Sequence, residues 1–158
     1  TEGNAFQWSF IAPHDMDNII STIGGKKEQE TRLDTLFTTS SQVDGEEASG
    51  DITGLIGQYA HGNEPSHHMA YLYNWTDSPW KGQERLDQIM QNFYTNAPDG
   101  IIGNEDCGQM SAWYVMSALG FYQIGPSDDR QSAYSCKRRY FRDLSKKQQC
   151  SQQIHQRG

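Results

Sequence analysis

Apolar residues recur at helical spacing in five segments of the first 126 residues, and this pattern constrains the fold more than any other feature. Residues that favour helix termini bound the segments: Asp15 suits an N-cap, Pro65 and Pro79 suit first turns, and Gly24 and Gly120 suit C-termini. No strand pattern of comparable strength is present. We therefore expect an all-α stack with helices over residues 16–23, 26–37, 65–75, 79–93 and 109–119.

The connecting segments are polar and rich in glycine. Residues 38–54 combine Ser, Gly and Asp, which predicts a loop that could line a site. Helices paired through such loops, with polar groups gathered at one set of ends, are typical of a helical toroid.

Charge is distributed unevenly along the chain. Residues 1–126 carry five Lys or Arg against 17 Asp or Glu, whereas residues 127–158 carry eight basic and three acidic side chains. An acidic body without a basic stripe offers nothing to a phosphate backbone, so we expect no nucleic-acid binding there. No apolar run approaches the roughly 18 residues of a membrane span, and the three cysteines lack the spacing of a disulfide framework or a zinc site.

Three clusters of polar residues stand out, at residues 1–15, 61–68 and 103–109. Their carboxylates lie near expected helix ends, so Glu64 and Asp106 could simply be helix caps. Alternatively, the oxygen donors of Asn63, Glu64 and Asp106, together with loop carbonyls, are what calcium prefers. Zinc is disfavoured, because the adjacent His67 and His68 should point in different directions.

Carboxylates that lie far apart in sequence, combined with tryptophans as flat platforms, also suit glycoside hydrolysis. The tryptophans are Trp8, Trp75, Trp80 and Trp113. Core packing is the simpler interpretation of Trp113 within its helix, whereas Trp80 is a candidate for binding sugar. The carboxylate candidates are Glu2, Glu64, Glu105 and Asp106.

Three segments together resemble the catalytic part of the family 92 glycoside hydrolases, which are calcium-dependent exo-acting α-mannosidases. The segments are TEGNAFQWSFIAPHD, GLIGQYAHGNEPSHHMAYLYNW and DGIIGNEDCGQMSAWYVMSALGFY. The resemblance runs almost continuously from Thr1 to Pro126. It implies that residues 1–126 are part of an (α/α)6 barrel that follows an N-terminal β-sandwich domain missing from this chain, and that this fragment is inactive alone.

The resemblance also implies roles for individual residues. Glu2 would be the general acid and Asp106 the general base of an inverting mechanism that removes terminal α-linked mannose, α-1,2-linked mannose above all, from mannose-containing glycans. Asn63, Glu64 and Asp106 would bind calcium. Such enzymes act in the periplasm, at the cell surface or after secretion.

The same resemblance places His14, Asp15 and Lys81 in motifs that border the sugar pocket. The chain departs from the family pattern at Asn104, where many relatives carry an aspartate.

Residues 127–158 form an atypical basic tail. The resemblance continues through residues 128–130 and then stops. Codons can be chosen for residues 145–156 so that a frame shifted by one base reads AKNSSAANKYI, which is similar to a family strand. A frameshifted translation is one hypothesis for the tail. Two alternatives to an α-mannosidase stay open: a non-catalytic remnant that binds calcium or glycan, and an interaction protein with a basic tail.

Overall fold

The computed structural model describes residues 3–42, 52–124 and 132–134. Glu2, most of the loop expected over 38–54 and nearly all of the basic tail therefore lie outside the described residues. Within them the chain is mostly helical. Its helices are α1 (Ala5–Trp8), η1 (Pro13–Asp15), α2 (Met16–Ile23), α3 (Lys26–Thr38), η2 (Glu64–Ser66), η3 (Met69–Trp75), α4 (Pro79–Phe93) and α5 (Gln109–Leu119).

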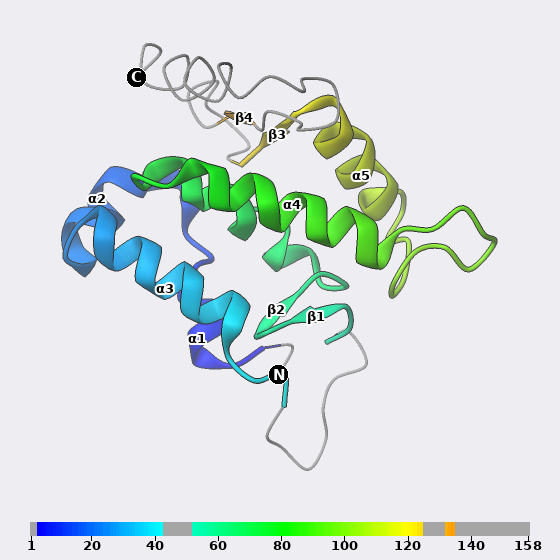
Figure 1. Ribbon diagram of the computed structural model, residues 1–158, viewed down its shortest axis with the longest axis horizontal. Coiled ribbons are helices and arrows are strands. Elements are labelled where there is room, and N and C mark those ends of the chain that lie inside the picture. Colours follow the sequence, from blue (N-terminus) through cyan, green and yellow to red (C-terminus); the bar gives the residue numbers. More distant parts are fainter. Residues whose placement is uncertain (1–2, 43–51, 125–131, 135–158) are drawn as a thin grey trace.

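Four of the five expected helices are confirmed, as α2, α3, α4 and α5. Glycines in the left-handed region end two of them, with φ of 108° at Gly24 and 93° at Gly120. In Figure 1, α4 crosses the middle of the molecule, with α2 and α3 toward one end and α5 toward the other. Among the described residues, no helix is both long and apolar enough to span a membrane.

The expectation of one helix over 65–75 is wrong, because this segment forms the 3₁₀ helices η2 and η3. Its hydrogen bonds close three-residue turns, as from the Tyr71 amide to the His68 carbonyl at 3.0 Å. All five residues from Met69 to Tyr73 are buried, and η3 packs against both α3 and α4. A segment that is buried on every side has no polar face. The spacing of its apolar residues therefore does not distinguish a 3₁₀ helix from an α-helix.

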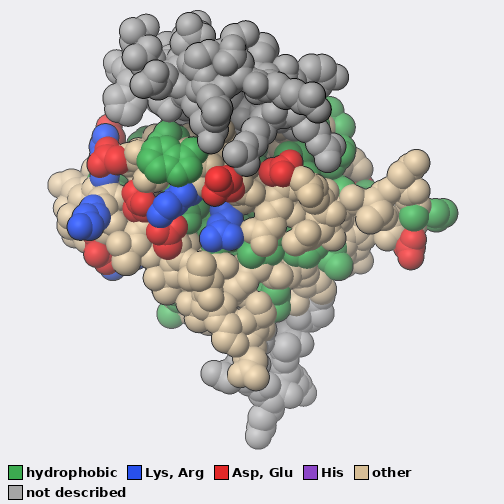
Figure 2. All heavy atoms as spheres, viewed as in Figure 1, with side chains coloured by type: hydrophobic (Ala, Val, Ile, Leu, Met, Phe, Trp, Pro, Cys, Tyr) green, Lys and Arg blue, Asp and Glu red, His purple; other side chains and the backbone are tan. Residues whose placement is uncertain are grey.

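The hydrophobic core surrounds η3. Its most deeply buried members come from α3, β2, η3, α4 and α5, and they are Leu33, Leu36, Tyr59, Ala70, Tyr71, Leu72, Tyr73, Ile89 and Trp113. Core packing of Trp113 is thus confirmed. Figure 2 shows acidic and basic side chains interspersed on the face where α3 and α4 lie.

Two short antiparallel strand pairs were not expected from the sequence. Strand β1 (Leu55–Ile56) pairs with β2 (Tyr59–Ala60), and β3 (Phe121–Gln123) pairs with β4 (Ser132–Tyr134). The turn between β1 and β2 rests on the end of α3, where the Gln58 amide donates to the Leu36 carbonyl at 2.7 Å. Strands of two or three residues are too short to show an alternating pattern.

Candidate active site

The first polar cluster begins with a capped helical turn. Asn4 and Gln7 form a capping box at the start of α1, with the Gln7 amide donating to Asn4 Oδ1 at 2.9 Å and the Asn4 amide to Gln7 Oε1 at 2.7 Å. Both side chains also reach the β1–β2 turn: Asn4 Nδ2 donates to Gln58 Oε1 at 2.9 Å and Gln7 Nε2 donates to the Gln58 carbonyl at 2.7 Å. The hairpin therefore fixes the loop that follows Glu2.

A small, open hollow lies between the first and second clusters. Gly3, Trp8 and Ile11 line it from the first cluster, and Asn63 and Pro65 from the second. Asn63 is only 6% exposed, whereas the neighbouring Glu64 is exposed at the start of η2. The structure thus brings one expected calcium ligand to the same concave surface as the residue that follows Glu2.

The second and third clusters pack through glycines. The Gly62 amide donates to the Thr53 carbonyl at 3.0 Å, and a Cβ on Gly62 would overlap the Thr53 hydroxyl. A Cβ on Gly103, whose φ is +72°, would lie 3.0 Å from the same hydroxyl. Because neither glycine leaves room for a side chain, the loops at 61–63 and 103–105 can approach closely.

Two buried histidines of the second cluster form a polar network. His61 Nδ1 lies 2.8 Å from the Tyr59 hydroxyl, and His61 Nε2 lies 2.7 Å from the Tyr94 hydroxyl. His67 Nε2 donates to the His61 carbonyl at 2.9 Å, which leaves His67 Nδ1 to accept from Gln109 Nε2 at 3.0 Å. The network joins the second cluster to the first turn of α5.

Burial keeps these imidazoles neutral. It lowers the pKa of His61 to about 3, with a further contribution from His67. It also lowers the pKa of His67 to about 4, although the hydrogen bond to the His61 carbonyl and the charge of Asp106 act in the opposite direction. The pKa of His68 is lowered as well, and its Nε2 donates to the Phe10 carbonyl at 2.6 Å. The adjacent histidines point to different partners, as expected.

The third cluster places its two carboxylates differently. Asp106 and Cys107 adopt positive φ angles of 51° and 56°, a conformation that few residues other than glycine adopt. Glu105 is exposed and accepts from the Ser111 amide at 3.2 Å and from the Ser111 hydroxyl at 3.0 Å. Glu105 therefore caps α5, and the half-buried Asp106 lies close enough to His67 to affect its pKa.

Four residues were expected to bind sugar, and none of them lines the hollow. They are His14, Asp15, Trp80 and Lys81. His14 and Asp15 are exposed in η1, where Asp15 caps α2 as predicted by accepting from the Asn18 amide at 3.3 Å. Trp80 is 48% exposed in the first turn of α4.

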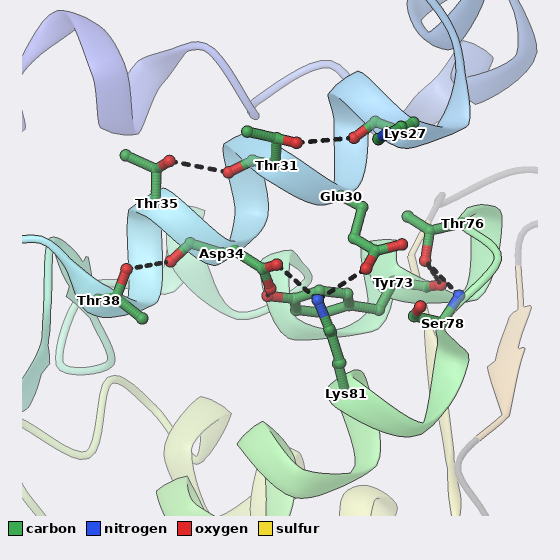
Figure 3. Close-up of polar contacts among 10 residues, drawn as sticks. All are labelled: Lys27, Glu30, Thr31, Asp34, Thr35, Thr38, Tyr73, Thr76, Ser78 and Lys81. Carbon is green, nitrogen blue, oxygen red and sulfur yellow. Dashed lines mark hydrogen bonds and ion pairs between the residues drawn. The ribbon is translucent and has the colours of Figure 1, made fainter.

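Lys81 belongs to α4, and its side chain reaches α3. Figure 3 shows its Nζ between two α3 carboxylates, 2.7 Å from Glu30 Oε1 and 2.5 Å from Asp34 Oδ2. The Tyr73 hydroxyl donates to the other oxygen of Asp34 at 2.8 Å. These contacts raise the pKa of Lys81, through hydrogen bonds to Asp34 first and Glu30 second. The ion pairs join two helices that pack on η3.

The donors that this region offers to a cation are oxygen atoms. Both nitrogens of His61 and of His67 already take part in hydrogen bonds. Within the described ranges, no three His, Cys, Asp or Glu side chains gather into a metal-binding group. Asn63, Glu64 and Asp106 supply amide and carboxylate oxygens, which agree with the donor preference of calcium.

Sequence reasoning did not single out Gln58 and Gln109, which join segments far apart in the chain. Gln58 binds Asn4 and Gln7 at the start of α1, and Gln109 binds His67. A glutamine in a turn or at a helix start carries no distinctive local signal, so only the three-dimensional arrangement identifies these two.

Comparisons with known proteins place this arrangement in context. A sequence model of the glycosyl hydrolase family 92 catalytic domain matches residues 1–149. The structure of a family GH92 α-mannosidase from Bacteroides thetaiotaomicron in complex with mannoimidazole is similar, with a TM-score of 0.74 and 47% identity, covering 81% of this chain and 17% of that chain. A second structure of that α-mannosidase gives a TM-score of 0.71 and 46% identity, over 81% of this chain and 16% of that one.

A more distant relative is described as an uncharacterized secreted glycosidase of Arthroderma benhamiae. It is 26% identical over 121 residues, which are 77% of this chain and 14% of the relative. The chain thus spans less than a fifth of the length of each of these proteins.

Proposed function

The chain belongs to glycosyl hydrolase family 92, and from this premise we propose that it is part of an α-mannosidase that removes terminal α-linked mannose from glycans. One observation carries the proposal: three clusters separated by 45 and 34 residues of sequence are joined in space, the first to the second and the second to the third. The first and second line one hollow, and the second and third are joined through His67 and Gln109. A glycosidase needs such convergence, because its two carboxyl groups must act on one sugar ring.

The proposed reaction inverts the anomeric configuration. The Glu2 carboxyl group gives its proton to the glycosidic oxygen, and the bond from this oxygen to the anomeric carbon breaks. Asp106 takes a proton from the water that attacks the same carbon from the opposite face of the ring. The products are mannose of inverted configuration and the shortened glycan. We expect the two carboxyl groups to be about 6.5 to 9.5 Å apart, which leaves room for the water.

We assign calcium binding to Asn63, Glu64 and Asp106, whose donor atoms are all oxygens. Calcium, when bound, would supply positive charge beside the hydroxyl groups of the terminal mannose and favour a flattened ring. The burial of Asn63 beside the hollow supports this assignment.

Further parts of the proposal concern the surroundings of the site. His14, Asp15, Trp80 and Lys81 are assigned to the border of the sugar pocket, with α-1,2-linked mannose as the substrate. The remaining walls would come from the rest of an (α/α)6 barrel and from a preceding β-sandwich domain. We place the enzyme outside the cytoplasm, in the periplasm, at the cell surface or secreted, because one relative is described as secreted.

The test uses the whole protein that contains this chain and measures turnover of p-nitrophenyl α-mannoside and of α-1,2-mannobiose. Glu2→Gln and Asp106→Asn should each lower kcat by about 10² to 10⁴, which is the usual contribution of general acid–base catalysis. The matched control is Glu105→Gln, since Glu105 neighbours Asp106 but caps α5. It should retain turnover within about threefold.

Two further measurements address the mechanism and the metal. Proton NMR of the first product should show β-mannose released from an α-mannoside, and a chelator should remove activity that added calcium restores. Near wild-type turnover by both Glu2→Gln and Asp106→Asn would overturn the assignment of acid and base. Binding of calcium and mannose without any turnover would favour a non-catalytic binding protein instead.

A further inference from the structure

Two adjacent histidines hold the two polar clusters that flank their own. His68 Nε2 donates to the Phe10 carbonyl at 2.6 Å, and Phe10 is a buried core residue just after α1. The Phe10 amide in turn donates to the Gln7 carbonyl at 3.4 Å. This contact ties Phe10, in the first cluster, to the segment between η2 and η3.

His67 makes the corresponding contact with the third cluster. Its Nδ1 accepts from Gln109 Nε2 at 3.0 Å, and its carbonyl accepts from Trp113 Nε1 at 3.0 Å. The Gln109 amide donates to the Asp106 carbonyl at 3.1 Å, which closes the turn that contains Asp106 and Cys107. A turn with two consecutive non-glycine residues at positive φ needs support from its surroundings. Gln109 supplies that support on the His67 side.

The spacing of the two contacts is set by covalent geometry. Consecutive Cα atoms are about 3.8 Å apart across a trans peptide, and both histidines have right-handed helical backbone angles at the junction of η2 and η3. Two histidines joined by one peptide bond therefore contact both segments: His68 contacts the segment that follows the proposed acid, and His67 contacts the segment that carries the proposed base.

We propose that His67 and His68 are positioning residues: His68 holds, through Phe10, the segment after the general acid, and His67 holds, through Gln109, the turn that carries the general base. This inference rests on the proposed function. An inverting glycosidase depends on the separation of its acid and base, because the nucleophilic water must fit between the base and the sugar. Neither histidine needs to touch the substrate for this role.

The experiment uses the whole protein and compares variants that remove the contact of His68 with variants that remove those of Gln109, whose Nε2 also donates to the Tyr122 hydroxyl at 3.3 Å. His68→Leu removes the donor to Phe10, whereas His68→Gln keeps an N–H donor of similar reach. Gln109→Met removes the donor to His67, and Gln109→Glu, which is closer in shape, replaces the amide by a carboxylate that cannot donate. Ser111→Ala is the matched control, because it weakens the start of α5 without contacting either histidine.

His68→Leu, Gln109→Met and Gln109→Glu should each lower kcat on p-nitrophenyl α-mannoside by about 10- to 100-fold, with KM within about twofold of wild type. His68→Gln should recover kcat to within about fivefold, and Ser111→Ala should keep kcat within about twofold while losing stability. A kcat unchanged in the contact variants, an equal loss of kcat in Ser111→Ala, or a rise in KM alone would each overturn the proposal.

Crystal structures of wild type and Gln109→Met give a readout that is independent of turnover. We expect the Asp106 carboxylate to move by about 1 Å in the variant, a displacement large enough to impair catalysis. If wild type hydrolyses no α-mannoside, the proposed function fails while this displacement still decides whether the His67–Gln109 contact positions Asp106. An unmoved Asp106 in an active enzyme would refute the positioning role alone.

Discussion

Replacement of Gly57 by alanine should be among the most destabilising single changes in this chain. Gly57 lies in the β1–β2 turn with φ of +62°, which an alanine adopts at a cost of about 1 to 2 kcal/mol. An added Cβ would lie 2.5 Å from the Leu36 carbonyl oxygen and 2.6 Å from the Phe37 carbonyl carbon. These are backbone atoms at the end of α3, so the hairpin itself must move, at a further cost of about 1 to 3 kcal/mol.

The expected total for Gly57→Ala is about 2 to 5 kcal/mol of lost unfolding free energy. Gly24→Ala is the control: Gly24 also has a positive φ, of +108°, but its added Cβ would have nothing closer than Glu28 Cβ at 3.7 Å. The control therefore isolates the conformational cost. Because the φ of Gly24 lies further than that of Gly57 from the left-handed region of L-residues, the conformational cost is at least as large in the control, and the difference between the two variants is a lower limit of the steric contribution of the contact with α3.

The assay is denaturant unfolding of the whole protein, followed by tryptophan fluorescence. Gly57→Ala should also lower kcat by about tenfold or more, because the displaced turn carries Gln58, which holds Asn4 and Gln7 beside the proposed acid. Gly24→Ala should not. An unfolding midpoint of Gly57→Ala equal to that of wild type would refute the argument that the hairpin has no room for the added Cβ.

Three further outcomes are expected. Because burial lowers the pKa of His61 to about 3 and that of His67 to about 4, the unfolded state binds more protons between those values and about pH 6.5. Stability should therefore be nearly fully present above about pH 7, and about 2 kcal/mol per imidazole should be lost between pH 7 and 5, whereas a flat pH profile of the unfolding midpoint would contradict this. Lys81→Met should lower stability by about 1 kcal/mol or less, since the ion pairs with α3 are partly exposed, and a rise in KM as well would support its assignment to the sugar pocket. Trp113→Phe should cost about 1 to 3 kcal/mol in thermal unfolding, because the buried His67 carbonyl loses its indole donor.

Much of the helical structure was predictable because its signals are local. Helix α2 has an amphipathic face between Asp15 and Gly24, and α5 ends at Gly120, where φ is positive. Such boundaries need only the preferences of a few neighbouring residues. The β1–β2 hairpin lacks a local signal, since each strand has two residues and its turn is held by the Leu36 carbonyl. Contacts of that kind cannot be read from periodicity.

The candidate site, too, was predictable only in part. Residue types located the three polar clusters, because glycines, carboxylates and amides are concentrated there. How the clusters meet depends on pairs such as Gln7 with Gln58 and His67 with Gln109, which are 51 and 42 residues apart in the chain. Nothing in the neighbourhood of either residue specifies its partner. Burial makes each of these polar side chains depend on its partner, because no water is available to form the hydrogen bond instead.

The two carboxylates at 105 and 106 show why a sequence motif alone cannot assign roles. Either residue could cap α5 or act in chemistry, since both precede the helix and both are acidic. The positive φ angles at Asp106 and Cys107 turn the chain between Glu105 and the helix. The Glu105 carboxylate thereby reaches Ser111 in the first turn of α5. Asp106 instead lies within electrostatic reach of the buried His67. A left-handed turn of two non-glycine residues is thus what separates a helix cap from a proposed catalytic base.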